Sequence, residues 1–251
     1  MDFGRILLAQ RPVILPVIHV LTADQAVENL RHVEALGGAG AFLINHDFGV
    51  APFLPILRDI RAACPQMWLG VNFLAQTGAV AFPILADLAR QGSPFQAYWA
   101  DDARIEERTA TEGADPAQPE AEEIARIRAE SGWHGLYLGG VAFKKQRPVA
   151  RSDESRAATL ARAYMDVVTT SGPATGHEAD VDKTRRFRAA LGTAPLALAS
   201  GITPENVARY ADHVDLMLVA TGINRPGDFY NIDPARLHAL QDALATGGTR
   251  G

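Results

Sequence analysis

The sequence predicts an α/β fold with a single domain, a (β/α)8 TIM barrel in which each of eight parallel strands is followed by a helix. Three observations predict it: short apolar runs alternate with helical patterns eight times, the chain has 251 residues, and long connections follow the apolar runs. Alternation favours parallel strands, because parallel neighbours need a crossover that is usually a helix. Eight such units in about 250 residues are typical of a closed barrel. The alternative is an open doubly wound sheet, but its glycine-rich dinucleotide-binding pattern does not follow the first strand.

The predicted strands are short apolar segments bounded by turn residues. They span residues 13–19, 41–45, 67–72, 95–99, 135–138, 165–169, 195–199 and 215–219. The helical patterns between them include residues 24–36, 78–90, 119–130 and 204–210. Asp24 and Thr203 can cap two of these helices, and Pro204 fits the first helical position.

The connections that follow the strands are longer than those that precede them. Residues 45–52, 100–118, 139–152, 170–180 and 220–233 follow strands, whereas helix-to-strand connections such as 65–66 and 192–194 are short. All strands of a parallel barrel point the same way, so the long loops collect at their carboxyl ends, where barrel active sites lie. We expect the barrel over residues 1–244 and a loose C-terminal tail over 245–251.

Composition excludes several classes of protein. The chain has 24 basic and 29 acidic residues, which indicates no broad basic surface and no nucleic-acid partner. A hydrophobic fraction of 47% excludes a disordered chain, and no apolar run reaches the roughly 20 residues of a membrane span. The lone Cys64 can form no internal disulfide. We expect a cytoplasmic protein without a cofactor or metal, and whether it forms a homo-oligomer stays open.

Small residues after three late strands predict a phosphate site. Ser171–Gly172, Ser200–Gly201 and Thr221–Gly222 follow the sixth, seventh and eighth strands. Backbone N–H groups in tight turns bind anions, and so does a helix N-terminus such as the one predicted at Pro204. The loops after strands seven and eight are the usual phosphate site of barrel enzymes. The alternative is that each glycine only makes a turn.

Polar side chains at the ends of the first three strands predict the rest of the site. His19, Asn45 and Asn72 are candidate substrate-binding residues, and His46 and Asp47 are candidate catalytic residues because they set a base beside a carboxylate. The alternative for each is a structural hydrogen bond, since buried polar groups are usually bonded.

Two lysines and two charged segments complete the predicted mouth. Lys144, and with less support Lys145, lies just beyond the fifth strand and can hold a phosphate or act as an amine nucleophile. Residues 144–151 hold four cations and could form a basic rim, and the charge-rich segment 101–112 is long enough for a lid. Plain solvated loops are the alternative for both.

Several segments of the sequence together resemble the BtpA/SgcQ family of the ribulose-phosphate-binding barrel superfamily. They are the segments 16–19, 44–53, 70–72, 143–144, 170–172 with 175–176, and 200–201 with 204–206. The resemblance implies a (β/α)8 fold and a phosphorylated small-molecule ligand; one branch is associated with photosystem I assembly and another with sugar metabolism. The chain departs from the family pattern after strand two, where it has Asn45–His46, and after strands three and four. It therefore resembles a divergent member that retains the turns predicted to bind phosphate after strands six, seven and eight.

We expect an enzyme that acts on a phosphorylated sugar or nucleotide-like metabolite by acid–base or lyase-type chemistry, as a lyase, isomerase or transferase. The rival is a non-catalytic assembly or regulatory protein that kept the barrel and the ligand.

Overall fold

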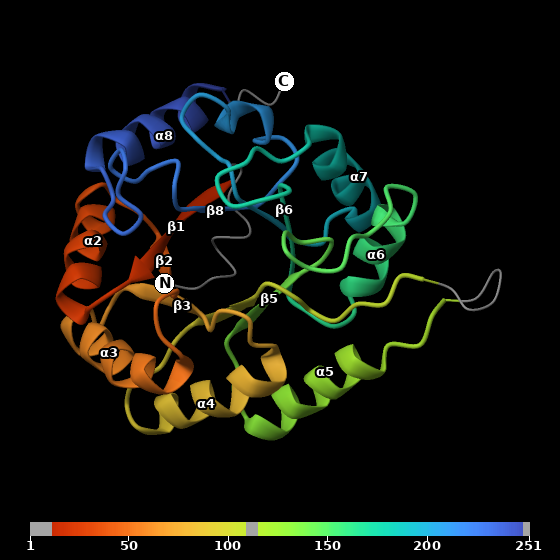
Figure 1. The fold of residues 1–251 in the computed structure, drawn as a ribbon, viewed down its shortest axis with the longest axis horizontal. Coiled ribbons are helices and arrows are strands. Elements are labelled where there is room, and N and C mark those ends of the chain that lie inside the picture. The colour runs from red at the N-terminus through yellow and green to blue at the C-terminus, as the bar shows by residue number, and fades with distance from the viewer. Residues whose placement is uncertain (1–11, 109–114, 248–251) are drawn as a thin grey trace.

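The computed structural model describes residues 12–108 and 115–247 and shows a closed barrel of eight parallel strands in the order β1-β2-β3-β4-β5-β6-β7-β8 (Figure 1). β1 pairs with β8 through Val13 and Leu216, which closes the ring. Helices surround the strands on the outside (Figure 1). The structure thus confirms the predicted (β/α)8 TIM barrel.

The strands and helices alternate along the chain. The strands are β1 (Val13–Val20), β2 (Gly40–Asn45), β3 (Trp68–Asn72), β4 (Ala97–Ala100), β5 (Leu136–Gly140), β6 (Val167–Ser171), β7 (Leu196–Ala199) and β8 (Leu216–Val219). The helices are α2 (Ala23–Ala35), α3 (Val50–Ala63), α4 (Gly78–Arg90), α5 (Pro119–Ser131), α6 (Glu154–Ala161), α7 (Val181–Leu191), the 3-10 turn η1 (Val207–Arg209) and α8 (Pro234–Gly247). No helix within the described residues is long and apolar enough to cross a membrane.

Side chains alternate between two cores along each strand, because successive strand residues point to opposite faces. Ile14 and Ile18 of β1 pack outward in the cluster shared with the helices, whereas Leu15 and Val17 pack in the barrel interior. The interior is filled by bulky and small side chains together, among them Phe42, Trp68, Trp99, Ala97 and Ala197. The barrel is therefore a packed core, and only its ends can form a site.

Three predictions about the helices differ from the structure. The helix expected over residues 204–210 is a turn followed by the three-residue η1, because the Asn206 side chain bonds the backbone of Gly201 and Thr203 and competes with regular helix bonds. Thr22, not Asp24, caps α2 by accepting from Gln25 N. α8 continues to Gly247, into the expected loose tail, and residues 248–251 lie outside the described part of the chain.

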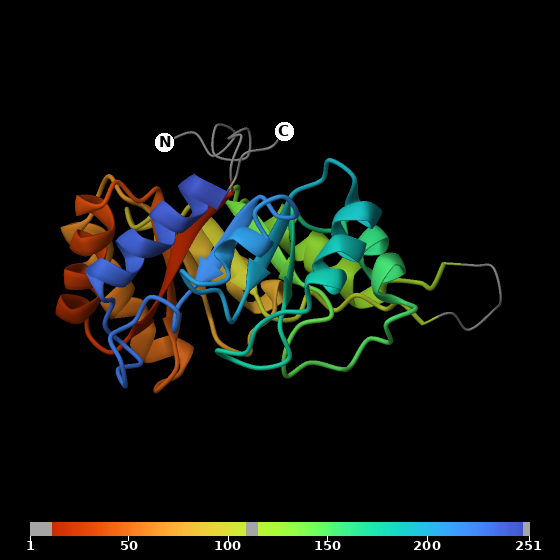
Figure 2. The same ribbon diagram turned by 90° about the horizontal axis from the view of Figure 1, so that it is seen from above.

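The loops at the carboxyl ends of the strands form one face of the molecule. In Figure 2 the loops after β5, β6 and β8 extend from the lower side of the barrel. The loop after β2 is shorter than expected, since α3 already begins at Val50. This face is the mouth of the barrel and holds the candidate site.

Candidate functional site

A narrow cavity of about 60 Å³ opens at the barrel mouth, between the loops after β5, β6, β7 and β8. Ten residues singled out in the sequence line it: His19, His46, Lys144, Lys145, Thr175, Gly176, Ser200, Gly201, Thr221 and Gly222. The remaining lining is largely apolar and includes Trp99 and Asp101. The structure therefore brings most of the predicted residues together.

Several polar residues of this cavity lie at strand ends, two positions beyond a residue whose side chain points into the barrel interior. His19 lies two residues beyond the interior Val17, His46 two beyond Ile44, and Asp101 two beyond Trp99. A period of two keeps such residues on one face of a strand. The same register that packs the interior thus directs these side chains into the mouth.

Asp101 is a site residue that sequence reasoning missed as such and treated only as the start of a charged segment. Its carboxylate accepts a hydrogen bond from Asn72 Nδ2 at 3.0 Å. Burial raises the pKa of Asp101, and the bond from Asn72 opposes that rise. Asn72 itself does not line the cavity and acts through Asp101. The signal that could have found Asp101 is its spacing from Trp99.

Lys144 reaches the cavity from a loop that is held at several points. Its backbone N–H donates to Ser171 Oγ at 2.8 Å. Nearby, Lys183 Nζ donates to the carbonyl oxygens of Ala142 and Ser171. Burial lowers the pKa of Lys144, and Asp101 opposes this shift as a nearby negative charge. The exposed neighbour Lys145 has a left-handed backbone with φ of 60°.

His19 is buried in the mouth under the β8–α8 loop. Its ring stacks on Phe229 with centroids 3.8 Å apart, and its Nδ1 lies 2.9 Å from the Phe229 carbonyl oxygen. Because a carbonyl oxygen only accepts, Nδ1 carries the proton and Nε2 is left as the basic nitrogen. Burial lowers the pKa of His19 to about 4, and neighbouring His46 contributes to the shift. His19 is therefore neutral at pH 7.

The turns after β7 and β8 present free backbone donors at the cavity. Within the described residues, the amides of Gly201 and Gly222 donate to no protein acceptor. Ser200 has φ of 75°, and its buried Oγ has no hydrogen-bond partner there either. Such a concave set of N–H and O–H donors is what an anion needs.

The glycines themselves are required for loop packing rather than for space around an anion. A Cβ on Gly201 would lie 2.2 Å from the His177 carbonyl oxygen, and one on Gly222 would lie 1.9 Å from the Ile202 carbonyl oxygen. A side chain at either position would therefore displace a neighbouring loop.

Four other predicted site residues do not line this cavity. Ser171 Oγ donates to the Gly172 carbonyl oxygen and accepts from Lys144 N, so its hydroxyl is used within the protein. Gly172 packs against the backbone at His177. Asn45 bonds the backbone of two loops. The exposed Asp47 accepts a hydrogen bond from Tyr230 OH at 3.1 Å.

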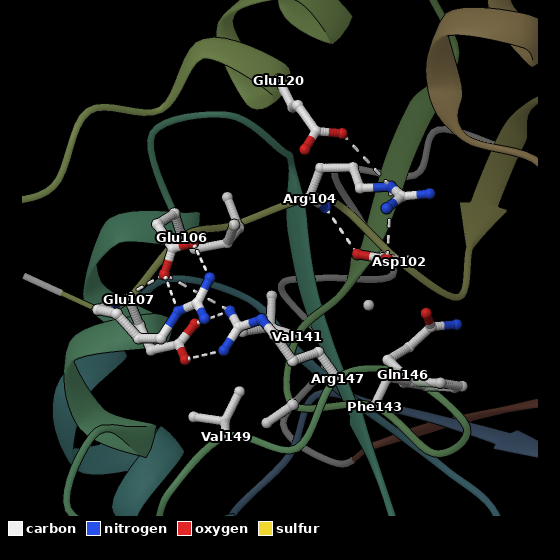
Figure 3. A pocket seen from close by; sticks show the side chains of 14 residues that line it. Asp102, Arg104, Glu106, Glu107, Glu120, Val141, Phe143, Gln146, Arg147 and Val149 are labelled. Atoms are coloured by element: carbon white, nitrogen blue, oxygen red, sulfur yellow. Dashed lines mark hydrogen bonds and ion pairs between the residues drawn. The ribbon is translucent and has the colours of Figure 1, made fainter.

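The expected basic rim and lid meet in a second cavity, outside the mouth. Figure 3 shows this cavity, of about 210 Å³, with Arg147 directed toward Glu107. Arg147 forms a two-pronged ion pair with the buried Glu107 at 2.5 Å. Its charge is thereby neutralised, and the pair ties the β5–α6 loop to the segment after β4. Residues 109–112 of the expected lid lie outside the described residues.

No cluster of three His, Cys, Asp or Glu side chains in residues 12–108 and 115–247 could hold a metal ion.

Solved barrel structures resemble the chain in fold. A tryptophan synthase alpha chain from Legionella pneumophila superposes with a TM-score of 0.66 at 14% identity and covers 98% of both chains. Phosphoribosyl anthranilate isomerase from Thermus thermophilus superposes with a TM-score of 0.58 at 15% identity, over 93% of this chain and 98% of that one. At such identities the similarity shows the fold alone.

Two curated proteins resemble the chain in sequence. The photosystem I biogenesis protein BtpA of Synechocystis sp. is 30% identical over 131 residues, which are 51% of this chain and 45% of that protein. An uncharacterised protein of Archaeoglobus fulgidus is 26% identical over 219 residues, 81% of this chain and 82% of that one. The chain thus matches less than half the length of the Synechocystis protein. Residues 20–246 match the model of the BtpA family.

Proposed function

The chain belongs to the BtpA family, and we propose that its barrel is an enzyme that binds a phosphorylated small metabolite at the mouth and acts on it by acid–base or lyase chemistry. The observation that carries the proposal is that anion donors and titratable groups share one cavity. The donors belong to the turns after β7 and β8, and the titratable groups lie near the end of β1 and after β2, β4 and β5.

The anion end of the proposed site rests on Ser200, Gly201 and Gly222. Their hydroxyl and amide groups have no protein partners in the described residues and line the cavity. The η1 turn is too short to add a helix dipole, so these donors and the nearby Lys145 must hold the phosphate. A charged hydrogen bond contributes about 1.5–3 kcal/mol, which makes a small number of donors sufficient.

The reacting end rests on His19, Asp101 and Lys144. His19 Nε2 is a neutral base, Asp101 has a pKa raised by burial, and Lys144 has a pKa lowered by burial. The pKa values of Asp101 and Lys144 move toward neutrality, which suits these two groups to proton transfer, and His19 adds an uncharged base at pH 7. Asp47, by contrast, is engaged with Tyr230 outside the cavity and has no part in this proposal.

A second candidate function is a non-catalytic role in assembly or regulation. The Synechocystis relative is a photosystem I biogenesis protein, which favours this role. In this role the barrel would bind the same phosphorylated ligand without converting it. The two functions therefore differ in turnover and agree in ligand binding.

Thermal melts test the phosphate site. Glycerol 3-phosphate at about 100 times its dissociation constant should stabilise the protein by about 2.7 kcal/mol, whereas glycerol at the same concentration should not. Ser200→Ala should weaken binding of the phosphorylated compound by about tenfold, or about 1.4 kcal/mol, because the variant loses a donor to the anion. Ser155→Ala, on the exposed surface of α6, is the matched control and should bind normally.

Equal stabilisation by glycerol and glycerol 3-phosphate, or none by either compound or by inorganic phosphate, would contradict the proposed site. Incubating the protein with a panel of phosphorylated sugars then separates the two functions. Conversion of any compound supports the enzyme, and binding without conversion supports the assembly role.

A further inference from the structure

We propose that Lys144 forms a Schiff base with a short phosphorylated aldehyde or ketone, and that Asp101 supplies the proton that expels water in this step. The inference rests on the proposed function and names the substrate class and reaction of the same cavity. It is carried by the placement of a confined amine, an oriented carboxyl group and an unpaired indole N–H across the cavity from the anion donors.

The order of the strands separates the two ends of the ligand. Asp101 follows β4 and Lys144 follows β5, whereas Ser200 and Thr221 follow β7 and β8. In a closed barrel of eight strands these pairs occupy different halves of the ring. A ligand held by its phosphate at the late strands therefore extends its other end toward Lys144 and Asp101.

The Lys144 amine is held in a confined position. The loop that carries it is fastened at its start by Lys183, which donates to the Ala142 carbonyl oxygen, and further along by the Arg147–Glu107 ion pair. Its Nζ lies 5.7 Å from the centre of the Phe143 ring, at the edge of the interior core. An amine in such surroundings loses hydration, which favours its neutral, nucleophilic form.

Asp101 lines the same cavity as Lys144 but forms no ion pair with it. Its carboxylate is oriented by Asn72, and no ion pair within 4.0 Å joins it to Lys144 among the described residues. The two groups line one cavity and influence each other's pKa as opposite charges. Their charged atoms therefore lie more than 4.0 Å apart and face one cavity, and the proposal places the reacting carbon and its oxygen between them.

The Trp99 indole adds an independent sign of a ligand. Trp99 is 4% exposed and lines the cavity, and its Nε1 has no hydrogen-bond partner in the described structure. A buried N–H without a partner is unfavourable, so it is expected to donate to a bound oxygen. A hydroxyl group beside the carbonyl carbon satisfies this donor. The site therefore fits a hydroxylated carbonyl compound, such as the open-chain form of a small sugar phosphate.

The proposed step balances without a further reactant. The neutral Lys144 amine attacks the carbonyl carbon, a C–N bond forms, and the C=O π pair moves to the oxygen, which takes the proton released from nitrogen. The protonated Asp101 carboxyl then gives its proton to the resulting hydroxyl group. Water leaves with the C–O bond pair, the nitrogen lone pair forms the C=N bond, and Asp101 remains as a carboxylate beside the iminium ion.

Borohydride trapping tests the inference on the full chain. The probes are dihydroxyacetone phosphate and glyceraldehyde 3-phosphate, each paired with its unphosphorylated counterpart, and the readouts are the intact mass and the modified peptide. We expect one reduced adduct on Lys144 with at least one phosphorylated probe. Lys144→Arg should abolish it, whereas the control Arg162→Lys, which adds an exposed lysine at the end of α6, should keep this single adduct, because an exposed lysine lacks the confined surroundings of Lys144.

Asp101→Asn tests the acid, since the asparagine carbonyl oxygen can still accept the bond from Asn72 but its amide group has no acidic proton to transfer. Adduct formation should slow by about a hundredfold while the melting temperature stays near that of the parent protein. An unchanged rate would remove Asp101 from the step. Stabilisation by a phosphorylated probe without an adduct on Lys144, or an adduct on the exposed Lys145 in its place, would overturn the Schiff base and leave the proposed function standing. Absence of both binding and adduct would overturn both.

Discussion

His19 shows how burial decides the chemistry of a single residue. As a histidine at the end of a strand it could equally serve as a core residue or as a cation. Its stacking on Phe229 and the lowering of its pKa to about 4 make it a neutral base at pH 7. The packing of a loop 210 residues away in the sequence contributes to this burial, and the neighbouring His46 lowers the pKa further.

The lowered pKa of His19 predicts a pH dependence of stability. Its folded-state pKa of about 4 lies below the value of 6.5 expected for an unfolded chain. Between these values the unfolded state binds more protons, so the free energy of unfolding should fall as the pH is lowered from 6.5 toward 4. The loss due to His19 is at most about 3 kcal/mol, because one pKa unit corresponds to about 1.4 kcal/mol.

Urea denaturation at pH 7 and pH 5 measures this effect. His19→Gln should reduce the difference in unfolding free energy between the two pH values. The control His134→Gln, at an exposed position, should leave the difference as it is in the parent protein. An equal pH difference in all three proteins would contradict the assignment.

At the scale of elements, the β5–α6 loop depends on a lysine from a neighbouring helix. Lys183 of α7 donates to the carbonyl oxygens of Ala142 and Ser171, at 2.5 and 3.0 Å. It thus joins the start of the loop that carries Lys144 to the end of β6. Burial lowers the pKa of Lys183 to about 8, because removing the charged ammonium group from water is unfavourable.

Lys183→Met should loosen this loop. The substitution keeps much of the side-chain volume and leaves two carbonyl oxygens without their charged donor, so stability should fall by about 1–3 kcal/mol. Hydrogen exchange should quicken in residues 141–147. Lys145→Met, at an exposed position in the same loop, should leave both quantities near their parent values. Unchanged exchange in Lys183→Met would show that other contacts hold the loop.

At the scale of the whole molecule, closure of the barrel depends on matching large and small residues across its interior. Gly70 of β3 faces Phe42 of β2, and a Cβ on Gly70 would lie 2.3 Å from the Phe42 ring. The ring therefore occupies the space that a side chain on β3 would otherwise take. Because interiors are close-packed, neither residue can change alone without strain.

Gly70→Ala should destabilise the protein by about 1–3 kcal/mol, since one added methyl group overpacks the barrel interior. Gly49→Ala is the control, because a Cβ there meets no atom within 4 Å and the position is exposed. Gly49→Ala should lower the free energy of unfolding by less than about 1 kcal/mol, because Gly49 is only the capping residue of α3. Chemical denaturation of both variants measures the difference. Equal losses would show that the Phe42 ring can move aside.

The barrel and most of its mouth follow from the order of residues along the chain. Apolar runs alternating with helical patterns predict parallel strands, and residues at the ends of such strands must meet at one face. Sequence reasoning therefore predicts one shared site for residues that do line one cavity, among them His19, His46, Lys144, Ser200 and Gly201. This part of the site is predictable because it depends on local periodicity and on topology, and residue spacing records both.

Which polar groups are free to act depends on contacts between distant segments. Asn45, Asp47 and Ser171 resemble site residues in sequence, but each is bonded within the protein. Asp101 is a site residue because Asn72 from another strand orients it, and position 201 needs glycine because a neighbouring loop occupies the adjacent space. The physical reason is that a hydrogen bond or a close contact between distant segments depends on three-dimensional position, which residue spacing along the chain does not record.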